Sequence, residues 1–252
     1  QDRSSAASDV YKRQHIYKLS QENKYFKNYI GRGYHESILP PVIQRNILEN
    51  PGWYTAYTPY QAEVAQGRLE ALLNYQTVIC DLTGMELSNA SLLDEGTSAA
   101  EAMTMLFANR EREKVNNNCN KFFVADDVFD QTLDVLMTRA EPLGIEIVKN
   151  SIDKINVDKS FFGSYVQYTG KNGQINDLKT ISKAISSFDI KLIVAADLLS
   201  LTILEKPSLF NCDVVVGTSQ RFGIPLGYGG PHAGYFATKK QYKRSIPGGI
   251  IG

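Results

Sequence analysis

The sequence lacks the features that mark several classes of protein. It has three cysteines, Cys80, Cys119 and Cys212, and only three histidines, and these residues show none of the spacings of a metal site. An odd number of widely spaced cysteines is typical of reduced thiols in a reducing compartment. The sequence therefore indicates neither a disulfide-stapled secreted protein nor a metalloprotein.

An excess of charge of one sign is absent as well. The 27 lysines and arginines match the 27 aspartates and glutamates, so no net field attracts nucleic acid or an anionic membrane surface. No apolar run approaches the roughly 18 residues of a membrane-spanning helix. We therefore expect no nucleic-acid partner and no membrane partner.

The chain is expected to consist of three parts. Residues 1–14 have no apolar signal core, and we expect a disordered tail or a non-native extension there. Residues 15–55 have an interrupted helical pattern in which Pro40 precedes one helix and Pro51 follows it, which predicts a helical amino-terminal arm. Residues 56–252 are numerous enough to form one large core.

Alternating strands and helices are expected in this third part. Apolar runs rich in β-branched and aromatic residues predict strands, and apolar residues at steps of three and four predict helices. The predicted strands are 121–125, 145–148, 164–168, 191–196, 213–217 and 234–238, and the predicted helices are 62–84, 98–110, 130–140 and 177–188. This alternation predicts an α/β fold with a mostly parallel sheet and helices on both faces.

A glycine-rich loop, residues 217–234, follows one of the most apolar predicted strands. Its glycines indicate that the backbone must pass close to another group. The neighbouring strand ends at Asp197, and ligands of open α/β sheets bind at the carboxyl ends of the strands. We therefore expect Asp197 and the turn formed by Ser219, Gln220 and Arg221 to share one crevice.

This arrangement is typical of one kind of cofactor pocket. A strand-end aspartate can hold the ring nitrogen of pyridoxal phosphate protonated, while a lysine in the later loop binds the cofactor covalently. Asp197 has the position of the aspartate, but residues 217–234 contain no lysine. We therefore expect that this chain alone does not bind pyridoxal phosphate covalently. The loop is also neither a dinucleotide fingerprint nor a P-loop.

Two segments carry a resemblance to a known family, namely AYTPYQ at residues 56–61 and GIPLGYGGPH at residues 223–232. With the sequence around them, from Tyr34 to Gly252, they resemble the amino-terminal half of glycine cleavage system P-proteins, the pyridoxal phosphate glycine decarboxylases. The resemblance implies the large domain of the aminotransferase-like fold type I, truncated here at its carboxyl end. In this family the long form has two homologous halves, and the catalytic half carries a His-Lys-Thr-Phe motif.

The resemblance also implies the positions of a degenerate cofactor site. Alignment of the loops places Gln220 where the catalytic half has its lysine, so this half is expected to be pseudo-catalytic. Asp197 corresponds to the partner of the ring nitrogen, with a helix cap or a strand-end hydrogen-bond acceptor as the alternative. His232 is a further position, with a solvated or hydrogen-bonded loop histidine as the alternative.

Ser98 is the candidate for the phosphate end of that site. Ser98 and Glu101 have the spacing of a capping box at the start of a helix. In a fold type I enzyme the cofactor phosphate binds at such a helix start, where free N–H groups converge. Asp94 and Glu95 lie immediately before it and would repel a phosphate dianion, so plain helix capping is the alternative.

Four residues are candidates for lining an active site completed by a partner: Tyr34, His35, Tyr57 and Tyr60. They follow backbone breaks at glycine or proline, where side chains can point toward a neighbour. A tyrosine side chain suits the wall of a pocket for a substrate as small as glycine. The alternative is that Tyr57 and Tyr60 pack internally.

The resemblance implies an activity for the whole enzyme. In the family, pyridoxal phosphate stabilises the carbanion left when glycine loses carbon dioxide, and the aminomethyl group passes to the lipoyl arm of the H-protein. The cofactor would be bound by a carboxyl-terminal half or a separate catalytic subunit, while this half shapes the pocket and the interface of an oligomer. A purely structural subunit is the alternative. We expect a cytoplasmic location, with the mitochondrial matrix as the alternative.

Overall fold

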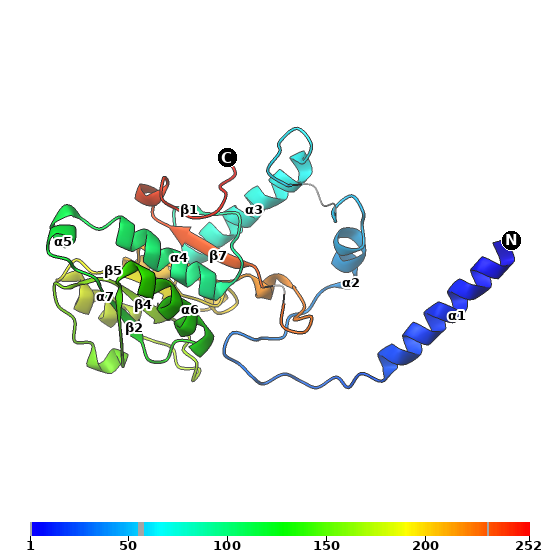
Figure 1. Cartoon of the computed structure of the whole chain (residues 1–252), viewed down its shortest axis with the longest axis horizontal. Helices are drawn as coiled ribbons and strands as arrows, with labels where there is room; N and C mark the ends of the chain where they lie inside the picture. The colour runs from blue at the N-terminus through cyan, green and yellow to red at the C-terminus, as the bar shows by residue number, and fades with distance from the viewer. Residues whose placement is uncertain (1, 55–57, 231) are drawn as a thin grey trace. The chain divides into compact units, whose positions relative to one another are not determined.

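The computed structural model describes residues 2–54, 58–230 and 232–252 (Figure 1). The chain divides into two compact units, residues 1–30 and residues 31–252. The boundary therefore lies earlier than the end of the predicted arm at residue 55. The reason is that residues after Gly31 pack against the same body as the sheet.

The smaller unit consists of a helix, α1 (Asp2–Gln21), and an extended segment. We expected a disordered tail or a non-native extension over residues 1–14, and the structure has a helix over residues 2–21. No proline or glycine interrupts residues 2–21, so nothing in the local sequence breaks the helix. The idea of a non-native extension stays a prediction.

The larger unit is built on a seven-stranded sheet in the order β1-β7-β6-β5-β4-β2-β3. The strands are β1 (Leu87–Ser88), β2 (Lys121–Ala125), β3 (Glu146–Asn150), β4 (Phe161–Gln167), β5 (Lys191–Ala195), β6 (Val214–Thr218) and β7 (Gly234–Thr238). Five neighbouring strands run parallel, in the order β3, β2, β4, β5 and β6. Strand β7 is antiparallel to both of its neighbours, β6 and β1. The predicted α/β fold with a mostly parallel sheet is confirmed.

The helices of the larger unit are α2 (Pro41–Ile43), which continues as a π-helix (Gln44–Leu48), α3 (Gln66–Thr83), α4 (Glu95–Ala108), α5 (Arg112–Asn116), α6 (Asp130–Ala140) and α7 (Leu178–Ser186). Of these, α3, α4, α6 and α7 pack against strands of the sheet. The crossovers through α6 and α7 lead in opposite directions along the sheet. Because such crossovers are right-handed, these two helices lie on opposite faces (Figure 1).

Short 3₁₀ turns complete the connections: Glu141–Leu143, Ile152–Lys154, Ser200–Thr202, Pro207–Phe210, Gln220–Phe222 and Lys240–Tyr242. Within the described part of the chain, no helix is both long and apolar enough to span a bilayer.

The core lies between the sheet and its helices. Every residue of β4, β6 and β7 is buried, as expected for strands covered on both faces. Helix α4 packs against β4, β5, β6 and β7, and Ala99, Ala100 and Met103 on it are fully buried. This packing holds the amino-terminal end of α4 beside the sheet.

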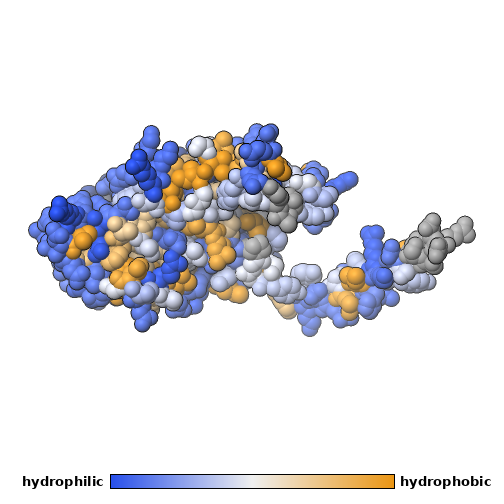
Figure 2. Space-filling model, turned by 45° about the horizontal axis from the view of Figure 1, so that its top comes forward, coloured by the Kyte–Doolittle hydropathy of each residue, from blue (hydrophilic) through white to orange (hydrophobic). Residues whose placement is uncertain are grey.

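Some apolar side chains remain on the surface of the larger unit. Figure 2 shows apolar residues scattered among polar ones over one face of the molecule. The exposed apolar side chains include Leu73 and Val78 on α3, together with Leu93, Ile203 and Phe222 in loops. Single apolar side chains exposed here and there on a surface are normal. Several exposed apolar side chains on one helix or strand are typical of a surface that contacts a partner.

Candidate functional site

A cleft opens at the carboxyl ends of the central strands. It consists of two adjoining cavities of about 380 Å³ and 240 Å³. Gly33, Glu95, Phe129 and Thr218 line both cavities. The cleft therefore lies at the edge of the sheet where the sequence predicted a crevice.

A segment from the start of the larger unit, residues 31–39, runs along the cleft. Ser37 donates a hydrogen bond from its Oγ to the carbonyl oxygen of Ile224 at 2.5 Å, and the ring of Tyr34 meets that of His232 edge to face with centroids 5.6 Å apart. Gly223 lies against the backbone of Ile38, where an added Cβ would come within 3.0 Å of the carbonyl oxygen. The segment is thus fixed to the glycine-rich loop.

Helix α4 begins at the cleft, but not as predicted. Asp94 is its N-cap, and the Asp94 carboxylate accepts a hydrogen bond from the backbone N–H of Thr97 at 2.7 Å. Ser98 lies inside the first turn, is 0% exposed, and donates its hydroxyl to the carbonyl oxygen of Asp94. The predicted capping box of Ser98 and Glu101 is therefore wrong. The extended backbone at Asp94 makes that residue the cap, and Ser98 lines neither cavity.

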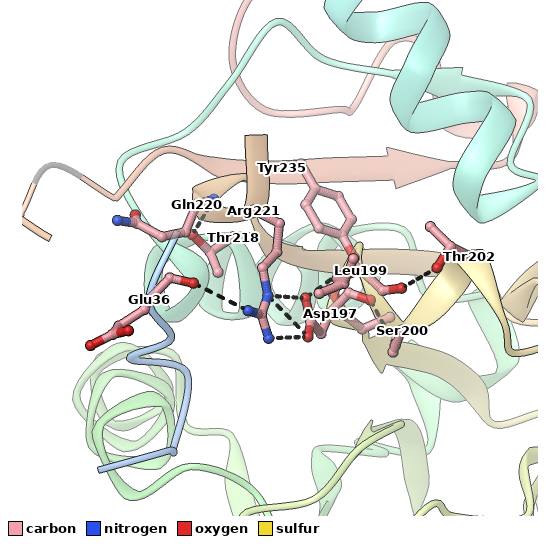
Figure 3. Close-up of polar contacts among 10 residues, drawn as sticks. Glu36, Asp197, Leu199, Ser200, Thr202, Thr218, Gln220, Arg221 and Tyr235 are labelled. Carbon is pink, nitrogen blue, oxygen red and sulfur yellow. Dashed lines mark hydrogen bonds and ion pairs between the residues drawn. The ribbon is translucent and has the colours of Figure 1, made fainter. Parts of the chain in front are cut away.

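Asp197 lines the smaller cavity, and Arg221 is paired with it (Figure 3). Arg221 Nε lies 3.0 and 3.2 Å from the two carboxylate oxygens of Asp197, and Arg221 Nη2 lies 2.8 Å from Oδ2. The backbone N–H of Leu199 also donates to Asp197 Oδ1 at 3.1 Å. Both oxygens of the candidate ring-nitrogen partner are thus engaged by groups of this chain.

Gln220 is buried beneath the loop rather than in the cleft. Its side chain is 1% exposed, and its Nε2 donates to the carbonyl oxygen of Ile224. Thr218, two residues earlier, lines both cavities and accepts a hydrogen bond from the backbone N–H of Gln220 at 3.2 Å. The residue at the predicted lysine position therefore serves the packing of the turn.

Three other candidate residues lie along the cleft. Tyr34 and His232 line the larger cavity, and His35 lines the smaller one. The Nε2 atom of His232 is buried and has no hydrogen-bond partner among the described residues. Burial lowers the pKa of His35, and the positive charge of Arg221 adds to the effect, so that His35 is neutral at physiological pH.

Tyr60 lines neither of these cavities. Tyr60 is 53% exposed, and its ring lies close to the backbone of Gly249, where an added Cβ would come within 2.8 Å of Cε1. Tyr57 falls outside the residues that the structure describes. Both residues stay candidates for the lining of a site that another chain completes.

Glu95 and Gln167 are two residues of the cleft that were not predicted as functional. Glu95 begins α4, and Gln167 ends β4 and donates its Nε2 to Glu95 Oε1 at 3.2 Å. Burial raises the pKa of Glu95 to about 7, and the negative charges of Asp197 and Asp94 add to the rise. The position of Gln167 at a strand end is the one signal in the sequence that could have marked it.

The residues of this site fit pyridoxal phosphate poorly. The position of the covalent lysine holds a buried amide that bonds to the backbone. The carboxylate of Asp197 is occupied by Arg221, and Asp94 and Glu95 bring two carboxyl groups to the helix start where a phosphate would bind. No step of a cofactor reaction follows from these side chains.

Glu95→Gln is expected to stabilise the chain at high pH. An unfolded glutamate titrates near 4.3, whereas Glu95 in the folded chain titrates at about 7. Between these values the folded state holds one proton more, so the free energy of unfolding falls as pH rises, by at most about 1.4 kcal/mol per pH unit, and levels off above pH 7. In the Glu95→Gln variant this residue does not titrate, so its free energy of unfolding does not fall in this way. In urea unfolding at pH 8 the free energy of unfolding of the variant should exceed that of the original chain by about 3–4 kcal/mol, and this difference should disappear near pH 4.5.

A matched change at an exposed carboxyl provides the control. Glu146→Gln alters a solvated side chain at the edge strand β3 and should leave the pH dependence of unfolding unchanged. Equal stabilities of the original chain and Glu95→Gln at pH 8 would show that Glu95 ionises as freely in the fold as in the unfolded state.

The comparisons with known proteins agree with this structure. The family model for the glycine cleavage system P-protein matches residues 2–252. The chain is 58% identical to a glycine dehydrogenase (decarboxylating) of Flavobacterium johnsoniae over 238 residues, which cover 94% of this chain and 25% of that protein. It is 59% identical to the protein of the same name from Christiangramia forsetii, covering 95% of this chain and 25% of the relative. The chain thus spans about a quarter of the length of the relatives it matches.

Solved structures give the same result. A crystal structure of glycine decarboxylase (P-protein) of the glycine cleavage system, in inhibitor-bound form, matches with a TM-score of 0.84 and 31% identity, covering 95% of this chain and 55% of that one. A cystathionine gamma-lyase from Lactobacillus plantarum shares the fold alone, with a TM-score of 0.55 and 14% identity over 76% of this chain and 50% of that one. The sheet, the cleft and both comparisons lead to one conclusion, that this chain belongs to the glycine cleavage system P-protein family.

Proposed function

We propose that this chain is the amino-terminal part of a glycine dehydrogenase (decarboxylating) and that it contributes structure rather than the reacting groups. The observation that supports this most directly is the 58% identity to a protein of that name, of which the chain spans only 25%. A relative of that name acts on glycine, and the family belongs to the glycine cleavage system. The substrate of the complete protein is therefore proposed to be glycine.

In this proposal, pyridoxal phosphate is bound by the remainder of the protein, either a fused carboxyl-terminal half or a separate subunit. The poor fit of Gln220 and Asp197 to that cofactor supports this division of roles. The lipoyl arm of an H-protein would accept the aminomethyl group. The assembly would be an oligomer in the cytoplasm, in which apolar side chains of α3 such as Leu73 and Val78 meet a partner.

The role of this half would be to wall the active site and exclude water from it. Tyr60 supports this role because its side chain is exposed and lies outside the internal core. Tyr34 and His35 support it less directly, since they line the cleft of this chain. A purely structural subunit without influence on the reaction is the alternative.

Removal of the Tyr60 hydroxyl from the complete protein tests this function. Tyr60→Phe keeps nearly all of the packing area, so a lining role predicts a fall of about tenfold, or 1.4 kcal/mol of transition-state stabilisation, in the exchange of labelled carbon dioxide with the carboxyl group of glycine. The melting temperature should barely change. Tyr57→Phe is the companion variant, and Tyr242→Phe, at a buried tyrosine, is the control that should keep full activity.

Two outcomes would decide against the proposal. A folded complete protein without glycine-dependent exchange would refute the assignment to glycine decarboxylation. Unchanged kinetics in Tyr57→Phe and Tyr60→Phe, together with a marked loss of stability on replacement by alanine, would assign both side chains to packing. This chain assayed alone should show no exchange and no adduct with pyridoxal phosphate that borohydride can fix.

A further inference from the structure

Glu95 is an acid at the centre of the cleft without a cationic partner. It lines both cavities, and its one hydrogen bond among the described side chains comes from Gln167. No lysine, arginine or histidine of the described chain lies within ion-pair distance of it. An ionised carboxylate in such a place is costly unless a positive charge joins it.

The nearby cations are already engaged by other acids. Arg221 is held by Asp197. Lys171, which lines the smaller cavity, pairs with Asp130 at 3.0 Å, and Arg32 pairs with the same carboxylate at 3.1 Å. None of these side chains can turn to Glu95 without giving up its own partner.

The remaining charge in the cleft is therefore negative. Asp94 lies beside Glu95 at the start of α4 and also lines the larger cavity. The pKa of His35 is lowered by burial, so this side chain adds no compensating charge at neutral pH. The cleft would repel an anion and attract a cation.

Gln167 provides a second, independent sign of a missing partner. Its side chain is 2% exposed and lines the smaller cavity. Its Nε2 donates to Glu95, while its Oε1 is buried without a hydrogen-bond partner in the part of the chain that the structure describes. A buried carbonyl oxygen without a donor destabilises the fold, so a donor in this cavity would be stabilising.

The choice between possible cations follows from these acceptors. A divalent metal ion takes several carboxylate, histidine or cysteine ligands, and among the described residues no group of three such side chains comes together. An ammonium group carries one positive charge and three N–H donors. It can satisfy the Glu95 carboxylate and Gln167 Oε1 together, and the cavities of about 240 and 380 Å³ leave room for a small substituent.

We propose that this cleft binds a small primary ammonium compound, with Glu95 as its counter-charge and Gln167 Oε1 as a second acceptor. Phe129, which lines both cavities, forms an apolar wall for the substituent. This proposal goes beyond the decarboxylase function and does not depend on it. The ligand could be the ammonium ion itself, a simple amine, or the ammonium group of an amino acid.

Binding is linked to the protonation of Glu95. The cleft attracts the cation only when Glu95 is ionised, so affinity rises as pH passes through about 7, and the bound cation in turn lowers the pKa of Glu95. The ionisable groups that interact with Glu95 or share the smaller cavity with it are Asp94, Asp197, Tyr165, Tyr235, His35, Lys171 and Arg32.

Thermal unfolding of the chain with two cations tests the site. At pH 8 and constant ionic strength, methylammonium chloride at ten times its dissociation constant should raise the melting temperature by about 3 °C. Tetramethylammonium chloride has the same charge but no N–H donor, and it should have no effect. The rise should disappear at pH 5.5, where Glu95 is protonated. Ammonium chloride and glycine as further ligands identify which source of the ammonium group binds best.

Two variants make the test specific. Glu95→Gln removes the charge but keeps the volume, and it should abolish the effect of methylammonium without loss of stability. Gln167→Met, which removes the free acceptor, should weaken binding at least tenfold, whereas the control Glu146→Gln should retain it. Equal shifts with methylammonium and tetramethylammonium, or a shift that survives in Glu95→Gln, would overturn the proposal.

Discussion

Gly217→Ala is expected to destabilise the fold by about 3 kcal/mol, because overpacking a core forces the backbone or buried side chains to move. An added Cβ at Gly217 would lie 2.4 Å from the carbonyl oxygen of Ala196 and 2.6 Å from Cε1 of Tyr235. Both neighbours are buried, and the Tyr235 hydroxyl donates to that same carbonyl at 2.6 Å. Neither neighbour can move away without disturbing the sheet.

Urea unfolding measures this loss, and Gly67→Ala is the matched control. Nothing lies within 4 Å of an added Cβ at Gly67 in the first turn of α3. Alanine is favoured over glycine in a helix by up to about 1 kcal/mol, so this control should be neutral or slightly stabilising. A Gly217→Ala chain that unfolds at the same urea concentration as the original would contradict the close contact at the end of β6.

Arg221→Gln is expected to destabilise the chain by about 3 kcal/mol, since it leaves a largely buried carboxylate without its charge partner. The side chains of Arg221 and Asp197 are only 19% and 20% exposed, and three close contacts join them. Asp197→Asn alone leaves the guanidinium without its counter-charge and should cost a similar amount.

A double-mutant cycle separates the pair from its surroundings. The double variant Arg221→Gln with Asp197→Asn carries two neutral groups that can still form a hydrogen bond, so it should be more stable than the sum of the single losses predicts, by about 1–2 kcal/mol. Additive losses would mean that each residue acts through other neighbours. In that case Asp197 would be free for a different partner.

Most strands of the sheet could be predicted because each is a short apolar run that is recognisable from its own sequence. The bounds of α6 and β7 agree with the predicted ranges 130–140 and 234–238. The sequence placed Asp197 near the turn of Ser219, Gln220 and Arg221, and in the structure Arg221 of that turn forms an ion pair with Asp197. Both results rest on local apolar patterns and on the rule that strand ends meet at one edge of a sheet.

The parts that the sequence did not predict depend on contacts between distant segments. Asp94 and Ser98 both have the chemistry of an N-cap, and only the extended backbone at Asp94 decides between them. The raised pKa of Glu95 arises from burial and from Asp197, which is far away in sequence. The role of Gln167 likewise requires β4 to lie beside the start of α4. No pattern within a short window contains that information.

The strand order has a consequence for the timing of synthesis on the ribosome. Among the strands that the structure describes, β1 pairs only with β7, and helix α4 covers β6 and β7, which leave the ribosome much later. At typical rates of translation this delay is on the order of ten seconds. Until β6 and β7 have emerged, the apolar face of α4, with Ala99, Ala100 and Met103, can cover only the part of the sheet formed by the earlier strands, such as β4 and β5. A nascent chain that ends before Gly234 should therefore be a strong client of chaperones that bind exposed apolar helices.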